Sequence, residues 1–422
     1  MEKEFNLLRK MNRYFVFLIP IFSIFFIACS YEKTEAKGKT PLILISMDGF
    51  RWDYFDKTDT PNFDLLISAG VKAKALIPSF PTKTFPNHIT IVTGKHPENH
   101  GIIANRMYDP VFDEFYYIGE GSAPVLDGKW YEAEPIWVTA EKQGQTAMTM
   151  FWPASEAEIM GVRPTEYFVY DGSVNHNERI DQILNWLDYT PSKRPQFLST
   201  YFSHLDDAGH NHGPGSEEVI GAIQEMDRSI GRLINGLKSR NMFQATNILL
   251  VSDHGMTSIS PDSIIFLDDY IDMDYVHIVD WSPVAAIRPK GDVNPIFNTL
   301  KNAHPKMTVY KKGDAPARMH YNNHRRIQPI TAVADEHWSI SSRENIDKGD
   351  HNEGFGKANH GYDPKYTSMG GIFVGHGPAF KQGMDGPGFT NIHLYEMMCK
   401  ILNLTPATND GSLDSIKVFL QN

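Results

Sequence analysis

Four short apolar runs constrain the fold of this chain more than any other feature of its sequence. They lie in the segments PLILISMDG, FLSTYFSHLDDAGH, NILLVSDHG and GGIFVGHG, at residues 41–49, 197–210, 247–255 and 370–377. Within each run the apolar residues follow one another instead of alternating with polar ones. This pattern predicts strands that are covered on both faces, as in a parallel sheet.

Amphipathic helices are predicted between these strands. In residues 216–239 apolar side chains recur at three- and four-residue steps, which is the pattern of a helix that packs on a sheet. In residues 60–70, Thr60 is a plausible N-cap and Gly70 a plausible end of a helix. The alternation of strands and helices predicts an α/β fold with a mostly parallel central sheet sandwiched by helices.

Residues 258–345 break this rhythm with short strand-like pieces among many Asp, Lys and His residues. We therefore expect a smaller inserted α+β lobe there. The main domain would be formed by residues 41–257 and 346–422.

The N-terminal 28 residues are typical of a signal peptide. Arg9, Lys10 and Arg13 precede the apolar run YFVFLIPIFSIFFIA at residues 14–28. This run is shorter than the roughly 20 residues that a membrane helix needs, so export of the protein is predicted.

The segment around Cys29 is similar to a bacterial lipoprotein cleavage box, with the small residue Ala28 just before the cysteine. We expect lipidation of Cys29, with simple secretion and an uncleaved anchor as alternatives. Residues 29–40 would form a tether, and the protein would be a periplasmic or cell-surface lipoprotein on a bacterial membrane. Cys399 is the only other cysteine, so no intramolecular disulfide is expected after processing.

The net charge of −11 argues against a nucleic-acid polymer as the main partner, because phosphate backbones require a basic surface. Small phosphorylated ligands stay possible. The sequence leaves the oligomeric state open.

Acidic and histidine side chains gather where the predicted strands end. They are Asp48, Asp206, His210, Asp253, His254 and His360. Each residue alone could be a helix cap or a hydrogen-bonded turn residue. In α/β folds, however, substrates and cofactors bind beyond the carboxyl ends of the strands, so the six residues together indicate a functional site. Asp and His without cysteine are typical ligands of a hydrolytic zinc or a similar divalent ion.

The segment PSFPTKTFPNHITIVTG at residues 78–94 adds a threonine-rich turn before an apolar helix. With it, the chain resembles the nucleotide pyrophosphatase/phosphodiesterase family of the alkaline phosphatase superfamily, from about Pro41 to about Pro406. The motifs that carry this resemblance are SMDGFRWDY, PTKTFPNHITIVTGKHPENHGIIANRMYDP, FWPASE, YDGSVNHNERI, YFSHLDDAGHNHGP, VSDHGM and ANHGYD with SMGGIFVGHGPAF. The resemblance implies an alkaline phosphatase-like catalytic domain.

The resemblance also implies two zinc ions side by side at the carboxyl edge of the sheet. One would be held by Asp48, Asp253, His254 and Thr84, and the other by Asp206, His210 and His360. Thr84 would be the nucleophile. A threonine hydroxyl is too weakly acidic to attack at neutral pH, so it would require activation by the metal, and a phosphothreonine would form and then hydrolyse.

Further roles follow from the same resemblance. Asn105 would donate its amide to a phosphate oxygen, with stabilisation of a turn as the alternative. Phe85 and Tyr170 would sandwich a nucleobase, with ordinary packing of the two rings as the alternative. Asn87 and His88 would support the nucleophile from behind. Trp152 is expected to pack, and its place in the motif FWPASE implies that it also shapes the pocket wall. We expect Lys83 and the basic cluster at residues 322–326 to face solvent.

The predicted function is an exported zinc phosphodiesterase that cleaves nucleotide phosphodiester or pyrophosphate bonds and releases nucleoside monophosphates. One alternative uses the same site on lysophospholipid or choline-phosphate diesters. A surface lipoprotein that binds phosphorylated ligands or zinc without turnover is a second alternative, although it would not need Thr84. A sulfatase is disfavoured because that family's Cys or Ser nucleophile motif is not found.

Overall fold

The computed structural model of the protein describes residues 40–119, 121–347 and 356–421. The predicted signal peptide, Cys29 and almost all of the predicted tether lie outside the described residues. Within the described residues, no helix is long and apolar enough to cross a membrane.

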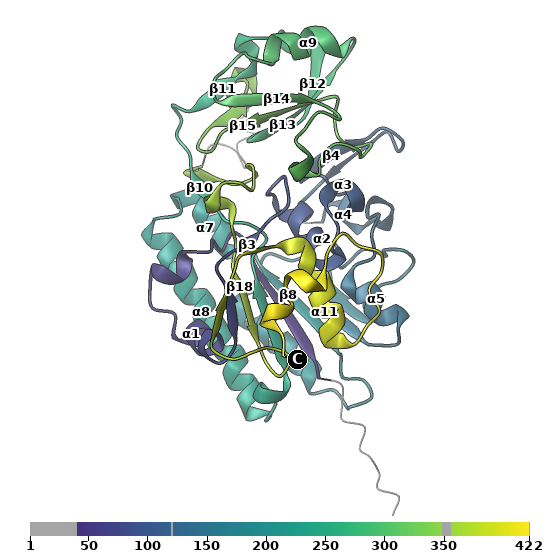
Figure 1. The fold of residues 1–422 in the computed structure, drawn as a ribbon, viewed down its shortest axis with the longest axis vertical. Coiled ribbons are helices and arrows are strands. Elements are labelled where there is room, and N and C mark those ends of the chain that lie inside the picture. Colours follow the sequence, from purple (N-terminus) through teal and green to yellow (C-terminus); the bar gives the residue numbers. More distant parts are fainter. Residues whose placement is uncertain (1–39, 120, 348–355, 422) are drawn as a thin grey trace, which may run out of the picture. The chain divides into compact units, whose positions relative to one another are not determined.

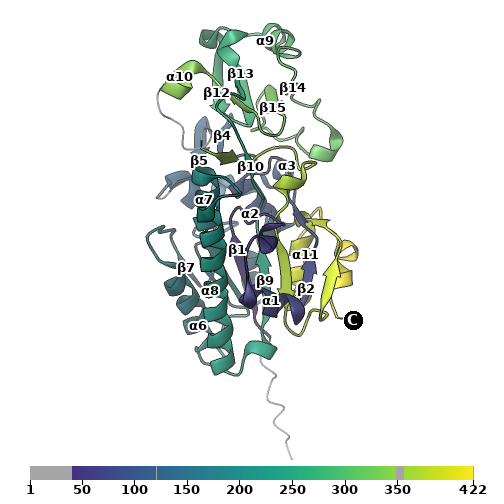
Figure 2. The same cartoon turned by 90° about the vertical axis from the view of Figure 1, so that its left-hand side faces the viewer.

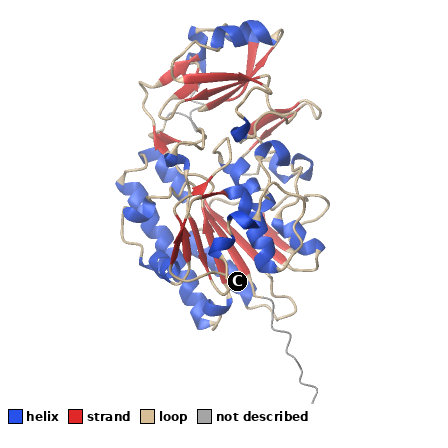
Figure 3. Cartoon of the chain, viewed as in Figure 1, coloured by secondary structure: helices blue, strands red, loops and turns tan. Residues whose placement is uncertain are grey.

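A sheet forms the centre of the fold (Figures 1 and 3). It has eight strands in the order β19-β2-β18-β9-β1-β8-β6-β7. Its strands are β1 (Leu42–Met47), β2 (Val71–Ala73), β6 (Ala147–Met150), β7 (Glu166–Phe168), β8 (Phe197–Phe202), β9 (Asn247–Val251), β18 (Phe373–His376) and β19 (Met384–Gly386). Strands β9, β1, β8, β6 and β7 are parallel to their neighbours in this run. The predicted α/β fold with a mostly parallel sheet is confirmed.

Strand β18 is the exception, because it runs antiparallel to both β9 and β2. A parallel neighbour needs a crossover connection that returns the chain to the starting edge of the sheet. The chain reaches β18 directly from the loop that carries His360, which lies at the edge where β9, β1 and β8 end. Strand β18 therefore starts at that edge and runs antiparallel to β9.

Side chains of β1 alternate between two hydrophobic clusters, one on each face of the sheet. Leu42 and Leu44 belong to the cluster that includes α2 (Thr84–Thr93), α5 (Ile136–Lys142) and α11 (Leu394–Leu402). Ile43 and Ile45 belong to the cluster that includes α1 (Pro61–Ser68), α6 (His176–Leu187) and α8 (Glu217–Ser239). Figure 2 shows α8 and α11 on opposite sides of the sheet. Burial on both faces explains the continuous apolar runs of the sequence.

The two predicted helices are confirmed, with a difference at one cap. Ser216 Oγ accepts a hydrogen bond from the Val219 amide and begins α8. Thr60 is at the N-cap of α1, but its side chain makes no capping hydrogen bond there. Instead Asp227 Oδ1 of α8 accepts from the amides of Asn62 and Phe63, at 2.9 and 3.0 Å. A carboxylate from another helix therefore caps α1.

Residues within the predicted insert form a second sheet, four-stranded and antiparallel, in the order β12-β13-β15-β14 (Figure 1). Its elements are β12 (Val276–Asp280), β13 (Val284–Pro289), α9 (Val293–Leu300), β14 (Met307–Lys311) and β15 (Ile330–Ala334), flanked by the parallel pair β11 (Ile264–Phe266) and β16 (Ser339–Ser341). This sheet has its own hydrophobic cluster, which includes Ala285, Ile287 and Ile330. The exact domain bounds stay a prediction.

Shorter elements connect these sheets. They are β3 (Leu76–Ile77), α3 (Pro97–His100), β4 (Arg106–Asp109), β5 (Glu114–Tyr117), α4 (Ala123–Leu126), α7 (His204–His212), β10 (Thr257–Ser258), α10 (Arg343–Asp347), β17 (Ala358–Asn359) and β20 (Phe389–Thr390).

The basic cluster at residues 322–326 does not form the solvated face that its sequence suggests. Arg326 is fully buried, and its Nε donates to Asp109 Oδ2 at 2.6 Å. Its Nη1 donates to the carbonyls of Gly101 and Trp130, at 2.6 and 2.8 Å. Although burial opposes it, Arg325 and Arg326 hold the pKa of Asp109 below its usual range. The cluster therefore joins the insert to the main domain.

Replacement of Arg326 by Met should lower the free energy of unfolding by about 3 kcal/mol, because it removes one of the two arginines that pair with the buried Asp109 and leaves the buried carbonyls of Gly101 and Trp130 without this donor. Chemical denaturation measures this loss. Lys129→Met is the control, since Lys129 and Glu114 form an exposed ion pair that contributes little. Equal stability of the two variants would contradict a buried role for Arg326.

Candidate metal centre and active site

The six predicted ligands come together at one edge of the central sheet. Asp48 follows β1, and Asp253 and His254 follow the neighbouring β9. Asp206 and His210 lie one turn apart on α7, which directly follows β8. His360 follows β17. Because β9, β1 and β8 are adjacent and parallel, their carboxyl ends lie side by side, as the sequence predicts.

Asp48, Asp253 and His254 form the first buried group, and their ligand atoms all lie within 4.8 Å of one another. His254 Nε2 is 3.0 Å from Asp253 Oδ2 and 3.4 Å from Asp48 Oδ1. Thr84 Oγ1 lies 3.5 Å from the same His254 Nε2. The geometry brings the hydroxyl of Thr84 to the edge of this group.

Asp206, His254 and His360 form the second group, again with ligand atoms within 4.8 Å. His210 Nε2 lies 3.3 Å from Asp206 Oδ2, and His360 Nε2 lies 3.8 Å from Asp206 Oδ1. The rings of His254 and His360 stack with centroids 3.6 Å apart. His254 is thus near both groups, although the resemblance to the family attributes it to the first.

All three histidines are oriented in the same way. The Nδ1 atoms of His210, His254 and His360 lie 3.0, 2.9 and 2.8 Å from the backbone carbonyls of Ala358, Gly255 and Thr82. A carbonyl at this distance requires Nδ1 to carry the proton, so Nε2 keeps its lone pair. Such backbone contacts are typical of histidines that bind a metal through the other ring nitrogen.

The carboxylates of the site lack enough partners of their own. Asp48 Oδ1, Asp206 Oδ1 and Asp253 Oδ2 are buried, and none has a hydrogen-bond partner among the described residues. Burial and repulsion by Asp253 and Asp206 raise the pKa of Asp48 well above its usual range. Buried carboxylates without partners are costly unless a cation neutralises them. Oxygen and imidazole donors without sulfur therefore fit zinc or a similar divalent ion.

Thr84 is the first residue of α2 and is almost fully buried. One turn later, His88 Nδ1 lies 2.8 Å from the Thr84 carbonyl, and its Nε2 lies 2.8 Å from Ser46 Oγ of β1. Asn87 Nδ2 donates to the carbonyls of Pro81 and Lys83. Both side chains hold the start of α2, in line with their predicted support of the nucleophile.

The three predicted substrate-binding residues lie around this centre. Asn105 Oδ1 accepts from the Phe85 amide at 3.0 Å, so the Nδ2 end of its amide is the one that can donate to an oxyanion. The Phe85 ring packs edge-on against Tyr116. The Tyr170 ring lies 6.0 Å from that of Tyr201, whose hydroxyl donates to Asp48 Oδ2 at 2.6 Å.

Two expectations for neighbouring residues are wrong. Lys83 does not face solvent, because its side chain is buried and its Nζ lies 2.7 Å from Asp280 Oδ2 of the insert. Trp152 is fully buried and packs against the His88 ring at 5.1 Å, so it supports α2 from within the core and does not form a pocket wall.

The structure also adds residues that sequence reasoning missed. Tyr201 donates to the ligand Asp48, and the Thr82 carbonyl faces the ligand His360. Tyr201 lies inside an apolar strand, where its sequence gives no sign of this hydrogen bond. Thr82 could have been noticed from its place two residues before Thr84.

Comparison with known proteins identifies the family of the chain. The profile of the type I phosphodiesterase/nucleotide pyrophosphatase family matches residues 42–363. Human ectonucleotide pyrophosphatase/phosphodiesterase family member 5 is 38% identical over 409 residues, which cover 96% of this chain and 83% of that protein. Bis(5'-adenosyl)-triphosphatase of Xenopus laevis is 37% identical over 409 residues, which cover 94% of this chain and 87% of that protein.

A solved structure gives the same result. Murine ectonucleotide pyrophosphatase/phosphodiesterase 5, as an inactive threonine-to-alanine variant in complex with AMP, superposes with a TM-score of 0.86 at 36% identity. The match covers 90% of this chain and 100% of the murine chain. Fold and sequence thus agree, and the chain is an enzyme that belongs to the type I phosphodiesterase/nucleotide pyrophosphatase family.

Proposed function

We propose that the protein is an exported, zinc-dependent phosphodiesterase that hydrolyses nucleotide phosphodiester and pyrophosphate bonds through a phosphothreonine on Thr84. The observation that carries the proposal is the position of the Thr84 hydroxyl, which lies 3.5 Å from His254 Nε2 beside two groups of metal-binding side chains. The inactive threonine-to-alanine variant of the murine relative, in complex with AMP, supports both the nucleophile and the nucleotide.

Two zinc ions fit the donor atoms described above. Asp48, Asp253, His254 and Thr84 would hold one ion, and Asp206, His210 and His360 would hold the other. When bound, zinc supplies positive charge that activates a hydroxyl or water and stabilises the charge on the reacting phosphate.

The reaction has two steps, each carried by residues of this chain. The Thr84 hydroxyl would lose its proton, and Oγ would attack the phosphorus. The bond from phosphorus to the leaving-group oxygen would break, and that oxygen would take up one proton in place of the one lost by Thr84. Water then cleaves the phosphothreonine, releases the nucleoside monophosphate and returns a proton to Thr84. Asn105 Nδ2 would donate to a non-bridging oxygen, while Phe85 and Tyr170 would stack on the base.

Charge favours a diester over a monoester. Three carboxylates and a deprotonated threonine balance two divalent ions, so a substrate with a single negative charge adds little repulsion. A dianionic monoester would need an additional cationic clamp. Lys83 adjoins Thr84 in sequence, but its ammonium is engaged by Asp280.

The purified protein should therefore hydrolyse a nitrophenyl ester of a nucleoside monophosphate faster than nitrophenyl phosphate by at least about 100-fold, the effect of one missing stabilising group. Steady-state kcat/KM values for the two substrates measure this ratio. A preference for the monoester would refute the proposal. A preference for nitrophenyl phosphocholine over both would favour the alternative of choline-phosphate diesters.

Thr84→Ala should lower kcat by about 1,000-fold or more, because no other hydroxyl is expected to replace the nucleophile. Its zinc content, measured by elemental analysis, should stay close to the wild-type value, which we expect to be about two ions per chain. Turnover at the wild-type rate would exclude Thr84 as nucleophile. Loss of zinc together with activity would show that Thr84 acts mainly as a ligand.

We further propose that the chain is exported and lipidated at Cys29 on a bacterial membrane. The relatives compared above are animal proteins, so this part rests on the N-terminal sequence alone.

Cys29→Ser should move the protein from the detergent phase to the aqueous phase of a detergent partition, because the serine cannot carry the thioether-linked lipid. Immunoblotting of the two phases measures the shift, with Cys399→Ser as the matched control. Aqueous partition of the wild type would contradict the anchor.

A further inference from the structure

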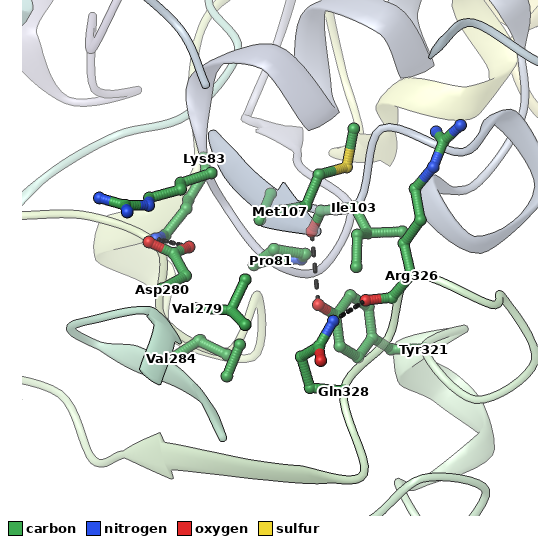
Figure 4. Close-up of a pocket in the computed structure, with 13 residues that line it drawn as sticks. Pro81, Lys83, Ile103, Met107, Val279, Asp280, Val284, Tyr321, Arg326 and Gln328 are labelled. Carbon is green, nitrogen blue, oxygen red and sulfur yellow. Dashed lines mark hydrogen bonds and ion pairs between the residues drawn. The ribbon is translucent and has the colours of Figure 1, made fainter. Parts of the chain in front are cut away.

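The residue before the predicted nucleophile carries a buried ion pair with the insert. Lys83 Nζ lies 2.7 Å from Asp280 Oδ2, and the two side chains are 4% and 6% exposed. Figure 4 shows the two side chains pointing toward each other between the main domain and the insert. Asp280 is the last residue of β12, and its Oδ1 accepts from the Trp281 amide at 3.0 Å.

The space beside this pair is not a ligand pocket. The cavity there is lined by residues of both regions, such as Pro81, Ile103, Val284 and Tyr321 (Figure 4). Its volume of about 10 Å³ is no larger than one water molecule requires. The geometry therefore makes Asp280 a partner of Lys83 and not of a substrate.

The main chain of Lys83 is held at the start of α2. Lys83 is the N-cap residue of that helix, and its carbonyl accepts from the amide of Asn87 and from Asn87 Nδ2, at 3.2 and 2.9 Å. Its own amide donates to the Pro81 carbonyl at 2.8 Å. With the side chain fixed by Asp280, both ends of Lys83 are restrained, and Thr84 is the next residue.

The preceding residue ties the same segment to a predicted metal ligand. The Thr82 carbonyl lies 2.8 Å from His360 Nδ1, and the Thr82 hydroxyl accepts from the Gly361 amide and donates to the Tyr362 carbonyl, both at 2.9 Å. A Cβ atom at Gly361 would lie 3.4 Å from Lys83 Cε, so the stem of Lys83 runs along this loop.

We propose that Lys83 and Asp280 are positioning residues, through which the insert holds the Thr84 hydroxyl at the distance from the metal-binding groups that the reaction requires. The inference rests on the proposed role of Thr84 as nucleophile. Misplacement of a reacting group by about 1 Å can cost about 100-fold in rate, so the pair acts on kcat.

The test compares the loss of one charge with the loss of both. Asp280→Asn leaves the buried ammonium of Lys83 without its anion. The double variant Lys83→Met with Asp280→Leu removes both charges, and replacement of a buried ion pair by packed apolar side chains is often neutral for stability. Lys306→Met is the matched control, because Lys306 and Asp335 form an exposed pair at 3.7 Å within the same insert. For each variant, kcat, KM, zinc content and the denaturation midpoint are measured.

Asp280→Asn should lower kcat about 10- to 100-fold with KM changed by less than about threefold. The double variant should recover the denaturation midpoint but keep the low kcat. An apolar contact does not fix the main chain at position 83 as the 2.7 Å ion pair of the wild type does. Zinc content should stay at the wild-type value, and Lys306→Met should match the wild type throughout.

A wild-type kcat in Asp280→Asn, or a kcat that recovers together with stability in the double variant, would overturn the proposal. If Asp280→Asn does not fold, the double variant alone decides the outcome. The proposed function fails separately, when Thr84→Ala keeps full turnover. If the Thr84→Ala variant is inactive and the separate Asp280→Asn variant is fully active, only the role of the ion pair is refuted.

Discussion

The buried carboxylates of Asp48, Asp206 and Asp253 are the constraint on which the rest of the structure depends. Each has an oxygen that lies in the interior without a hydrogen-bond partner among the described residues, and a bound cation would supply the missing partner there. Around them, backbone carbonyls orient three imidazoles so that each presents Nε2 to the same region. The site is thus arranged to bind metal before any substrate arrives.

The parallel sheet is what makes this concentration of charge possible. The neighbouring strands β9, β1 and β8 end at one edge of the sheet. A predicted metal ligand follows each strand within four residues, so the buried strands fix where these ligands lie. The insert takes part through Asp280 and Arg326, which are joined to the main domain by buried ion pairs. In this arrangement the start of α2 is held by the sheet through His88 and by the insert through Lys83.

Much of the site could be predicted because its residues adjoin elements with strong local patterns. The four apolar runs locate the strand ends, and the polar residues beyond them are then the ligand candidates. The burial of Lys83 and Arg326 was mispredicted for one reason. A charged side chain in a loop is exposed in most proteins. The burial of these two side chains depends on partners far away in the chain, Asp280 and Asp109.

The sequence by itself determined the α/β class, the strand ends, the ligand types and the position of Thr84 within a family motif, because these depend on local periodicity and on short ordered motifs. Only the tertiary structure decided that β18 runs antiparallel, that Asp227 caps α1 and that Lys83 pairs with the insert. It also placed His254 near both ligand groups. These features arise from contacts between residues distant in sequence, and local patterns carry no information about which distant partner a side chain will meet.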